Sequence, residues 1–245
     1  KKAEVLKAQE VFALSVLSEL AFLAYSGKTG ENSKIAISVN DPTSMRIEEI
    51  AKAFGALVAR AEVGEANVVN RARELRAEGY EVRILGEGSN GGNITHPAAV
   101  RDPLNSIFAL IKLLAIKDGN NPDGSEKKGL FHLWCSLSNQ EEKYSEDFSL
   151  IDVIETLPVY TTTGVSEARA LLKIKTPDHS VLKAKYQKIF LSQWDEKKAS
   201  LEEKYGICNY EAVCNNGTKE TKNISDFSIS GKGGLKILLK DKNQN

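Results

Sequence analysis

The chain has 245 residues, enough for one large domain or two smaller ones with proper hydrophobic cores. Its 33 Lys and Arg residues balance 33 Asp and Glu residues, and this zero net charge argues against binding to nucleic acid or a membrane surface by bulk electrostatics. Three cysteines without a Cys-x-x-Cys spacing and three scattered histidines argue against a disulfide framework or a zinc site. We therefore expect reduced thiols and a cytoplasmic protein.

An apolar stretch near the N-terminus, residues 11–25, has a composition close to that of a signal peptide. Glu19 interrupts it, and it contains no evident small-residue cleavage site. It is also too short and too charged to span a bilayer. We predict an amphipathic helix packed on a core.

Between residues 35 and 116, short apolar runs alternate with stretches of helical periodicity. Glycines end two of the helical stretches, and Asp102 followed by Pro103 forms a good start for a further helix. Strands that alternate with helices predict a three-layer α/β/α sandwich around a mainly parallel sheet. The expected elements are strands at 35–39, 56–59 and 82–85 and helices at 44–54, 65–77 and from 103 onward.

After residue 117 the composition changes, and a polar, turn-rich stretch at 118–124 predicts a surface loop. Short helices and a linker follow, and the pattern then becomes that of part of a smaller α+β domain. We expect domains at 1–170 and 171–245. The elements expected in the second part are a long helix that starts at Thr176-Pro177 and ends at Tyr205 before Gly206, strands at 209–213, 227–229 and 235–239, and a hairpin turn at 230–234.

The most informative segment is the glycine-rich stretch Gly86-Glu87-Gly88-Ser89-Asn90-Gly91-Gly92. It satisfies the Gly-x-Gly-x-x-Gly pattern of dinucleotide-binding proteins, but that pattern requires a helix to begin directly after the loop. Here residues 93–97 intervene, and the next helix begins only near Pro103. A nicotinamide-dependent dehydrogenase is therefore a disfavoured alternative.

Glu87 and Ser89 stand two residues apart, so both side chains can project to the same side of an extended loop. A carboxylate and a hydroxyl in this arrangement can share hydrogen bonds with adjacent hydroxyls of one sugar ring. The surrounding glycines allow the backbone to approach a ligand closely. The alternative is a glycine-rich turn with a solvated glutamate.

The order of these motifs resembles that of the third domain of the α-D-phosphohexomutases, the phosphoglucomutase and phosphomannomutase family. In that family a Val-Gly-acid step precedes a Gly-Glu-x-Ser-Gly type loop, as Val63-Gly64-Glu65 precedes the loop of this chain. Arg101-Asp102 matches the family's Asp-bearing helix start. The resemblance is good from residue 35 to 116 and looser through the linker 160–164 into the β region.

The sequence departs from the family pattern at several positions. Many members have a His where this chain has Gly91, and a Lys near the step where this chain has Glu62 and Ala66. A Ser-His-Asn-Pro type phosphoserine loop, an Asp-x-Asp-x-Asp metal loop and a Ser-Gly-Thr-Glu-Pro type phosphate loop do not occur in this sequence. We therefore expect no catalytic residue and no metal ligand here, and we expect this part alone to be inactive.

The resemblance implies a parent enzyme that interconverts hexose 1-phosphate and hexose 6-phosphate through a phosphoserine and a bisphosphate intermediate. It implies Mg²⁺ and a hexose 1,6-bisphosphate activator in that enzyme, with neither bound by this part, and a hexose phosphate as the partner. A non-catalytic sugar-phosphate-binding module is the alternative. The residues expected to contact the sugar are Glu87 and Ser89, with Asn90, Asn93, His96 and Arg101 at the rim.

Overall fold

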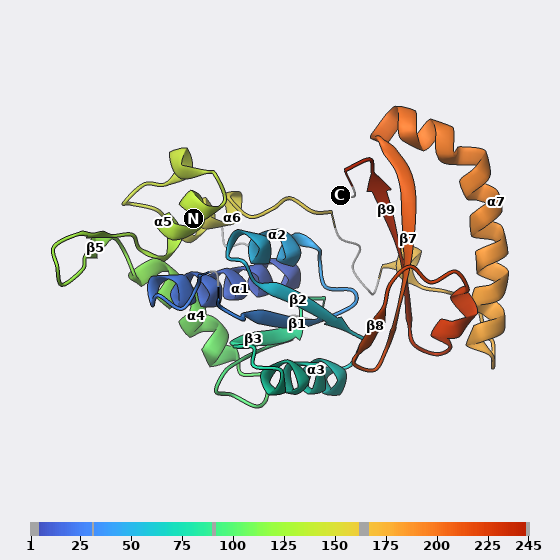
Figure 1. Cartoon of the computed structure of the whole chain (residues 1–245), viewed down its shortest axis with the longest axis horizontal. Coiled ribbons are helices and arrows are strands. Elements are labelled where there is room, and N and C mark those ends of the chain that lie inside the picture. The colour runs from blue at the N-terminus through green and yellow to red at the C-terminus, as the bar shows by residue number, and fades with distance from the viewer. Residues whose placement is uncertain (1–4, 31, 90–91, 162–166, 244–245) are drawn as a thin grey trace.

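The computed structural model describes residues 5–30, 32–89, 92–161 and 167–243. The described residues form two units, one built on a four-stranded sheet and one on a three-stranded sheet, each with its own helices (Figure 1). A small two-stranded sheet belongs to the first unit. The larger α/β unit extends to the end of α6 (Leu150–Glu155), and the C-terminal unit begins with α7 (His179–Tyr205). The predicted domain boundary at residue 170 lies in the segment between these two helices.

The first sheet has the strand order β2-β1-β3-β4. Strands β1 (Ala36–Asn40), β2 (Leu57–Ala61) and β3 (Ile84–Glu87) are parallel. Strand β4 (Gly92–Thr95) runs antiparallel to β3 and forms a hairpin with it. The mainly parallel sheet that the sequence predicts is confirmed, but β4 was not predicted.

Helices cover both faces of this sheet. Figure 1 shows α1 (Ala8–Tyr25) and α2 (Arg46–Ala53) above the sheet and α3 (Glu65–Ala77) below it. One apolar cluster joins α1 and α2 to the sheet, and a second joins α3 to the opposite face. The predicted three-layer α/β/α arrangement is confirmed.

Helix α1 lies inside the unit instead of on its surface. Every residue from Phe12 to Ala21 is buried, because helices α4 (Pro103–Ala115) and α5 (Leu130–Leu137) pack on its outer side. Its Glu19 is buried and pairs with Lys112 and Arg83. The predicted helix is present, but its expected amphipathic character is wrong.

Among the described helices, α1 alone is long and apolar enough to cross a membrane by length and composition, and 67% of it is buried within the protein. A central core helix of a folded protein meets the same criteria.

The sequence predicts the remaining elements of the α/β unit only in part. Asp102 caps α4 as expected, since its side chain accepts a hydrogen bond from the Leu104 amide at 2.9 Å and Pro103 occupies the first turn. The predicted loop at 118–124 contains the first strand of a small hairpin. That hairpin consists of β5 (Gly119–Asn120) and β6 (Glu126–Lys127). After α5, a 3₁₀ turn (Glu141–Lys143) and α6 complete the unit.

The C-terminal unit is a three-stranded antiparallel sheet with the order β8-β7-β9, covered by α7. Helix α7 is capped by Asp178, two residues after the predicted start at Thr176-Pro177. It ends as predicted at Gly206, whose φ of 70° is the left-handed conformation that glycine adopts readily. The strands are β7 (Ile207–Asn216), β8 (Lys219–Thr221) and β9 (Gly234–Asp241).

In the C-terminal unit, one predicted strand is wrong, and one observed strand was not predicted. Residues Phe227–Ser230 form a 3₁₀ turn, so the stretch 230–234 is not a hairpin turn between two strands. Asp226 starts the turn by accepting a hydrogen bond from the Ser228 amide, and Phe227 is buried among the aromatic side chains of α7. The missed strand β8 has only three residues, too few for a period-2 pattern.

Candidate functional site

The candidate site lies where strands β1 and β3 end. These strands are parallel and adjacent, with Val39 paired to Gly86, so Asn40 and Glu87 come next to each other at the carboxyl edge of the sheet. Ligands bind at this edge in open α/β sheets. The β3–β4 hairpin then turns back, pairing Glu87 with Gly92.

Glu87 is only 4% exposed and its carboxylate is held by three groups. Oε1 accepts hydrogen bonds from Asn40 Nδ2 at 3.0 Å and from the Gly64 amide at 3.1 Å. Oε2 forms an ion pair with the guanidinium of Arg101. A buried carboxylate requires such partners, and a carboxylate has about four acceptor positions. Glu87 is therefore fixed in one orientation with about one acceptor position to spare.

Asn40 connects Glu87 to Ser89. Its Nδ2 also lies 3.4 Å from Ser89 Oγ, and its Oδ1 accepts a hydrogen bond from Thr43 Oγ1 at 2.6 Å. Thr43 Oγ1 in turn accepts from the Gly88 amide at 3.0 Å. Asn40, at the end of β1, and Thr43 thus hold the turn that carries both predicted sugar contacts; we call residues 40–43 the β1–α2 loop.

Two of the glycines pack closely against neighbouring side chains. A Cβ atom on Gly88 would lie 2.7 Å from Gln9 Oε1 and 3.0 Å from Thr43 Cγ2. A Cβ atom on Gly92 would lie 2.5 Å from the Arg101 guanidinium carbon. The Arg101 guanidinium therefore lies directly on the hairpin backbone. Any side chain at position 92 would displace it.

The electrostatics of the site are dominated by Arg101. Its guanidinium pairs with Glu87 and, at 2.7 Å, with Glu65 at the start of α3. One cation between two carboxylates leaves a net negative charge, so the arrangement suits neutral hydroxyl groups better than a second anion. The charged contact of a phosphate needs a basic group that is not already neutralised.

The structure brings together Glu87, Ser89 and Arg101 of the six predicted site residues. Asn93 is buried on β4, and its Oδ1 accepts a hydrogen bond from Ser106 Oγ of α4 at 2.7 Å. His96 is exposed and follows β4 at the end of the hairpin opposite Glu87. Asn90 lies outside the described residues.

Asn40, Thr43 and Glu65 were missed in the sequence as members of this site. Asn40 was assigned only to the turn that closes the first strand. The signal that identifies it is its position, since polar residues at the carboxyl ends of adjacent parallel strands converge. In the sequence, Glu65 supports only the resemblance to the family.

The dinucleotide alternative is wrong. In the structure, β3 ends at Glu87 and β4 starts at Gly92, so the glycine-rich stretch joins two antiparallel strands. A pyrophosphate site of the dinucleotide type needs the amino end of a helix at that position.

The described carboxylates of the site do not fit a magnesium ion. Arg101 already occupies the space between Glu65 and Glu87, and Mg²⁺ requires six oxygen ligands in near-octahedral geometry.

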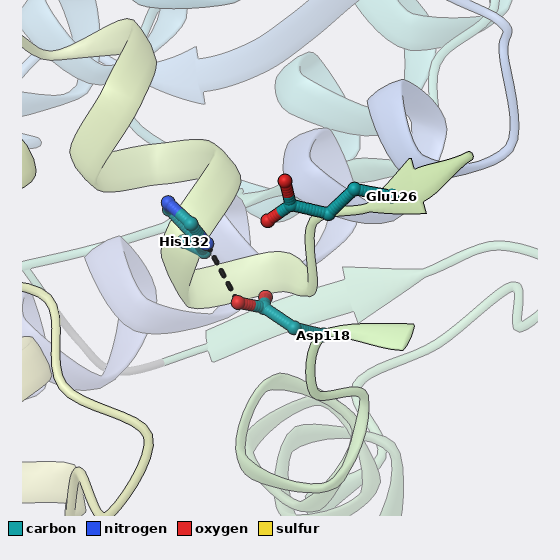
Figure 2. A group of neighbouring side chains, drawn as sticks. All are labelled: Asp118, Glu126 and His132. Atoms are coloured by element: carbon teal, nitrogen blue, oxygen red, sulfur yellow. Dashed lines mark hydrogen bonds and ion pairs between the residues drawn. The ribbon is translucent and has the colours of Figure 1, made fainter. Parts of the chain in front are cut away.

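A second group of potential ligands lies far along the chain, where Asp118, Glu126 and His132 place one ligand atom each within 4.8 Å of one another (Figure 2). His132 Nδ1 lies 2.7 Å from Asp118 Oδ2, and Nε2 lies 3.3 Å from Glu141. Asp118 also accepts from the Gly129 amide, and these bonds lower the pKa of its carboxyl group against the opposing effect of burial. The cluster fastens the β5–β6 hairpin to α5, and its imidazole is a poor match for Mg²⁺.

Residues 16–128 match the family model described as phosphoglucomutase/phosphomannomutase, alpha/beta/alpha domain III. This part of the chain, a little under half of its length, is therefore similar to the third domain of the phosphohexomutases. The matched residues include strands β1 to β4, helices α2 and α3 and the second half of α1. They therefore contain the hairpin that holds Glu87.

A solved structure of a phosphoglucomutase from Paramecium, the exocytosis-sensitive phosphoprotein pp63/parafusin in its open form, is similar over 96% of this chain, with 11% sequence identity and a TM-score of 0.42. The chain spans 32% of that protein. No curated protein matches the sequence of the chain.

Proposed function

We propose that the phosphohexomutase third domain of this chain holds the sugar hydroxyls of a hexose phosphate in a longer enzyme. That enzyme would interconvert the 1-phosphate and the 6-phosphate through a phosphoserine and a hexose 1,6-bisphosphate. Phosphohexomutases are isomerases of carbohydrate metabolism. The phosphoserine, the Mg²⁺ loop and the phosphate loop would be supplied by other parts of the parent.

The observation that carries the proposal is the bridge that Asn40 makes between Glu87 and Ser89. It holds a carboxylate and a hydroxyl on one side of the same turn, at the ligand-binding edge of a parallel sheet. Adjacent hydroxyls of a sugar ring need such a pair of neighbouring acceptors.

The geometry suggests how a sugar would enter. The bond from Asn40 to Ser89 is long, at 3.4 Å, so a ligand hydroxyl that bonds Ser89 would displace a weak interaction. Glu87 Oε2 pairs with the guanidinium of Arg101, whose side chain is 40% exposed. A sugar hydroxyl would therefore approach Glu87 from the side on which Arg101 lies. Binding here would contribute orientation, which can lower a reaction barrier by roughly 7–11 kcal/mol in favourable systems.

The test is a coupled mutase assay on the full-length parent with glucose 1-phosphate and mannose 1-phosphate, in the presence of Mg²⁺ and a hexose bisphosphate. The variants are Ser89→Ala and Glu87→Gln, and the exposed Glu142→Gln serves as the matched surface control. We expect Ser89→Ala to raise KM about tenfold, the effect of one lost hydrogen bond. Glu87→Gln should lower kcat/KM by roughly a hundredfold, because it also releases Arg101.

Circular dichroism and a melting curve must show that each variant stays folded. If Ser89→Ala and Glu87→Gln retain the activity of the control, the family assignment stands and the sugar contacts lie elsewhere. If the parent is inactive on both sugars but binds a hexose phosphate in a calorimetric titration, the non-catalytic binding module is the correct function.

A further inference from the structure

The β1–α2 loop contacts the C-terminal sheet directly. Asn40 donates to Glu87 and Ser89, and the next residue, Asp41, accepts a hydrogen bond from Asn215 Nδ2 of β7. Lys236 of β9 lies with its Nζ 3.6 Å from Asp41 Oδ1. Adjacent residues of one loop therefore face the candidate sugar site and the C-terminal sheet.

Hydrogen bonds from one arginine tie the peptide units of this loop to one another. One nitrogen of the buried Arg60 donates to three of its carbonyl oxygens, those of Asn40 at 3.3 Å, Asp41 at 2.9 Å and Thr43 at 2.8 Å. The shared guanidinium links the three peptide units, because a shift of one carbonyl moves the guanidinium and weakens its hydrogen bonds to the other two. Thr43 then holds the Gly88 amide, so a shift of Asp41 reaches the turn that carries Ser89.

The contact at Asp41 is incompletely satisfied. Among the described residues, Asp41 Oδ2 and Asn215 Oδ1 are buried and lack a hydrogen-bond partner. Burial raises the pKa of Asp41, an effect that Lys236 and Asn215 oppose, and burial lowers the pKa of Lys236. Gly234 packs so closely that a Cβ atom there would lie 2.3 Å from Asp41 Oδ2. Replacing such a buried ionic contact with apolar side chains often leaves stability unchanged or improves it, so stability alone does not account for it.

We propose that Asp41 is a positioning residue through which docking of the C-terminal sheet, by Asn215 and Lys236, fixes the β1–α2 loop and thereby Glu87 and Ser89. The effect on sugar binding rests on the proposed function, whereas the effect on the loop does not. The C-terminal sheet then acts on the sugar site without touching the sugar.

Two amide protons report on the loop without any ligand. The Gly88 amide donates to Thr43 Oγ1, and the Gly64 amide donates to Glu87 Oε1. Hydrogen exchange of both, followed by NMR on this chain, measures whether the turn and Glu87 remain in place. The Leu130 amide, which bonds Ile116 in a distant part of the fold, is the internal reference.

The variants are Asn215→Ala and Lys236→Met, with Lys236→Arg as the conservative rescue. The matched control is Thr218→Val, which removes a hydrogen bond of 2.7 Å between the same two units, from Thr218 to Glu74, away from the loop. We expect the first two variants to accelerate exchange at Gly88 and Gly64 about tenfold relative to Leu130. Lys236→Arg and Thr218→Val should leave these rates within about twofold.

In the full-length parent, Asn215→Ala and Lys236→Met should raise KM for the hexose phosphate about tenfold while kcat changes less than twofold, because the loss is one of positioning. Unchanged exchange at Gly88 and Gly64 in both variants, with intact folding, overturns the proposal. Equal effects in Thr218→Val also overturn it, since general loosening of the contact would then suffice. Accelerated exchange in a parent without mutase activity would keep the coupling and reject only the sugar site.

Discussion

The α/β unit and the C-terminal unit are stabilised in different ways. In the α/β unit, large apolar side chains from α1, α2, α4, α5 and the sheet form one contiguous cluster around the buried helix α1. In the C-terminal unit, the buried cluster among described residues consists of Ala212, Cys214, Ile224 and Phe227, with partly buried side chains around it. Small cores supply little stability beyond the entropy they must offset.

Because its own core is small, the C-terminal unit depends for its stability on its contacts with the α/β unit. The α/β unit has the core of an independently folding domain, whereas the C-terminal sheet has one helix and depends on neighbours for the rest of its burial. Its contacts with the α/β unit include hydrogen bonds, such as those from the Glu62 amide to the Gly217 carbonyl at 2.8 Å and from the Gly217 amide to Glu62 Oε2 at 2.7 Å. The C-terminal sheet is therefore expected to loosen first.

The same substitution in each core tests this difference most strongly. Phe131→Ala removes a fully buried ring from the large cluster and should cost about 3–5 kcal/mol, because the surrounding side chains cannot collapse into the cavity. Phe227→Ala should lower the melting temperature of the C-terminal unit alone. Differential scanning calorimetry measures both, and a single transition shifted equally by the two variants would show that the units unfold together.

Buried and half-buried ion pairs give the next contrast. Arg60 makes five hydrogen bonds, two to Glu48 and three to backbone carbonyls. Arg60→Met should cost about 3–5 kcal/mol, because the Glu48 carboxylate and these carbonyl oxygens lose their partner. Lys240 of the C-terminal sheet makes a single ion pair, with Glu211 at 2.6 Å, and Lys240→Met should cost about 1–3 kcal/mol because it leaves one buried acceptor unpaired. Urea unfolding followed by tryptophan fluorescence compares them. Equal costs would contradict the distinction drawn between the units.

Two glycines are needed for different reasons, and their replacement separates these reasons. Gly88→Ala should cost about 1–3 kcal/mol through the contacts with Gln9 and Thr43, and Gly88→Asn should cost more. Gly206→Ala should cost about 1–2 kcal/mol through its left-handed φ, and Gly206→Asn should cost less because Asn tolerates that conformation. Thermal unfolding provides the ranking. A milder effect of Asn at both positions would show that the turn at Gly88 is not limited by space.

The cysteines give the smallest and simplest contrast. Cys135 lies in the large core, where burial raises the pKa of its thiol to about 11, so at pH 8 roughly one molecule in a thousand carries the reactive thiolate. Cys208 at the start of β7 is only half-buried. Iodoacetamide at pH 8 should label Cys208 in the native protein and Cys135 only after unfolding, as read by peptide mass spectrometry. Rapid native labelling of Cys135 would show that the large core opens readily.

Much of the sandwich could be predicted because its signals are local. Helix α3 occupies the predicted residues 65–77, and α4 starts at the predicted Asp102-Pro103 cap. The strands β4 and β8 escaped prediction because they are short and gain their hydrogen bonds from a neighbouring strand. The sequence predicts a strand at the 3₁₀ turn of Phe227 because an alternating apolar pattern does not show which core the ring will join.

The sequence by itself determined the order of the α/β elements, the family resemblance and the choice of Glu87 and Ser89 as candidate sugar contacts, since periodicity, caps and glycine spacing act over a few residues. Only the tertiary structure decided that Asn40 bridges this pair, that Arg101 is shared between Glu65 and Glu87, and that His96 lies at the other end of the hairpin. These contacts join residues far apart in the chain. Their formation depends on which strands pair and in which direction, and on the burial that makes an unpaired charge costly.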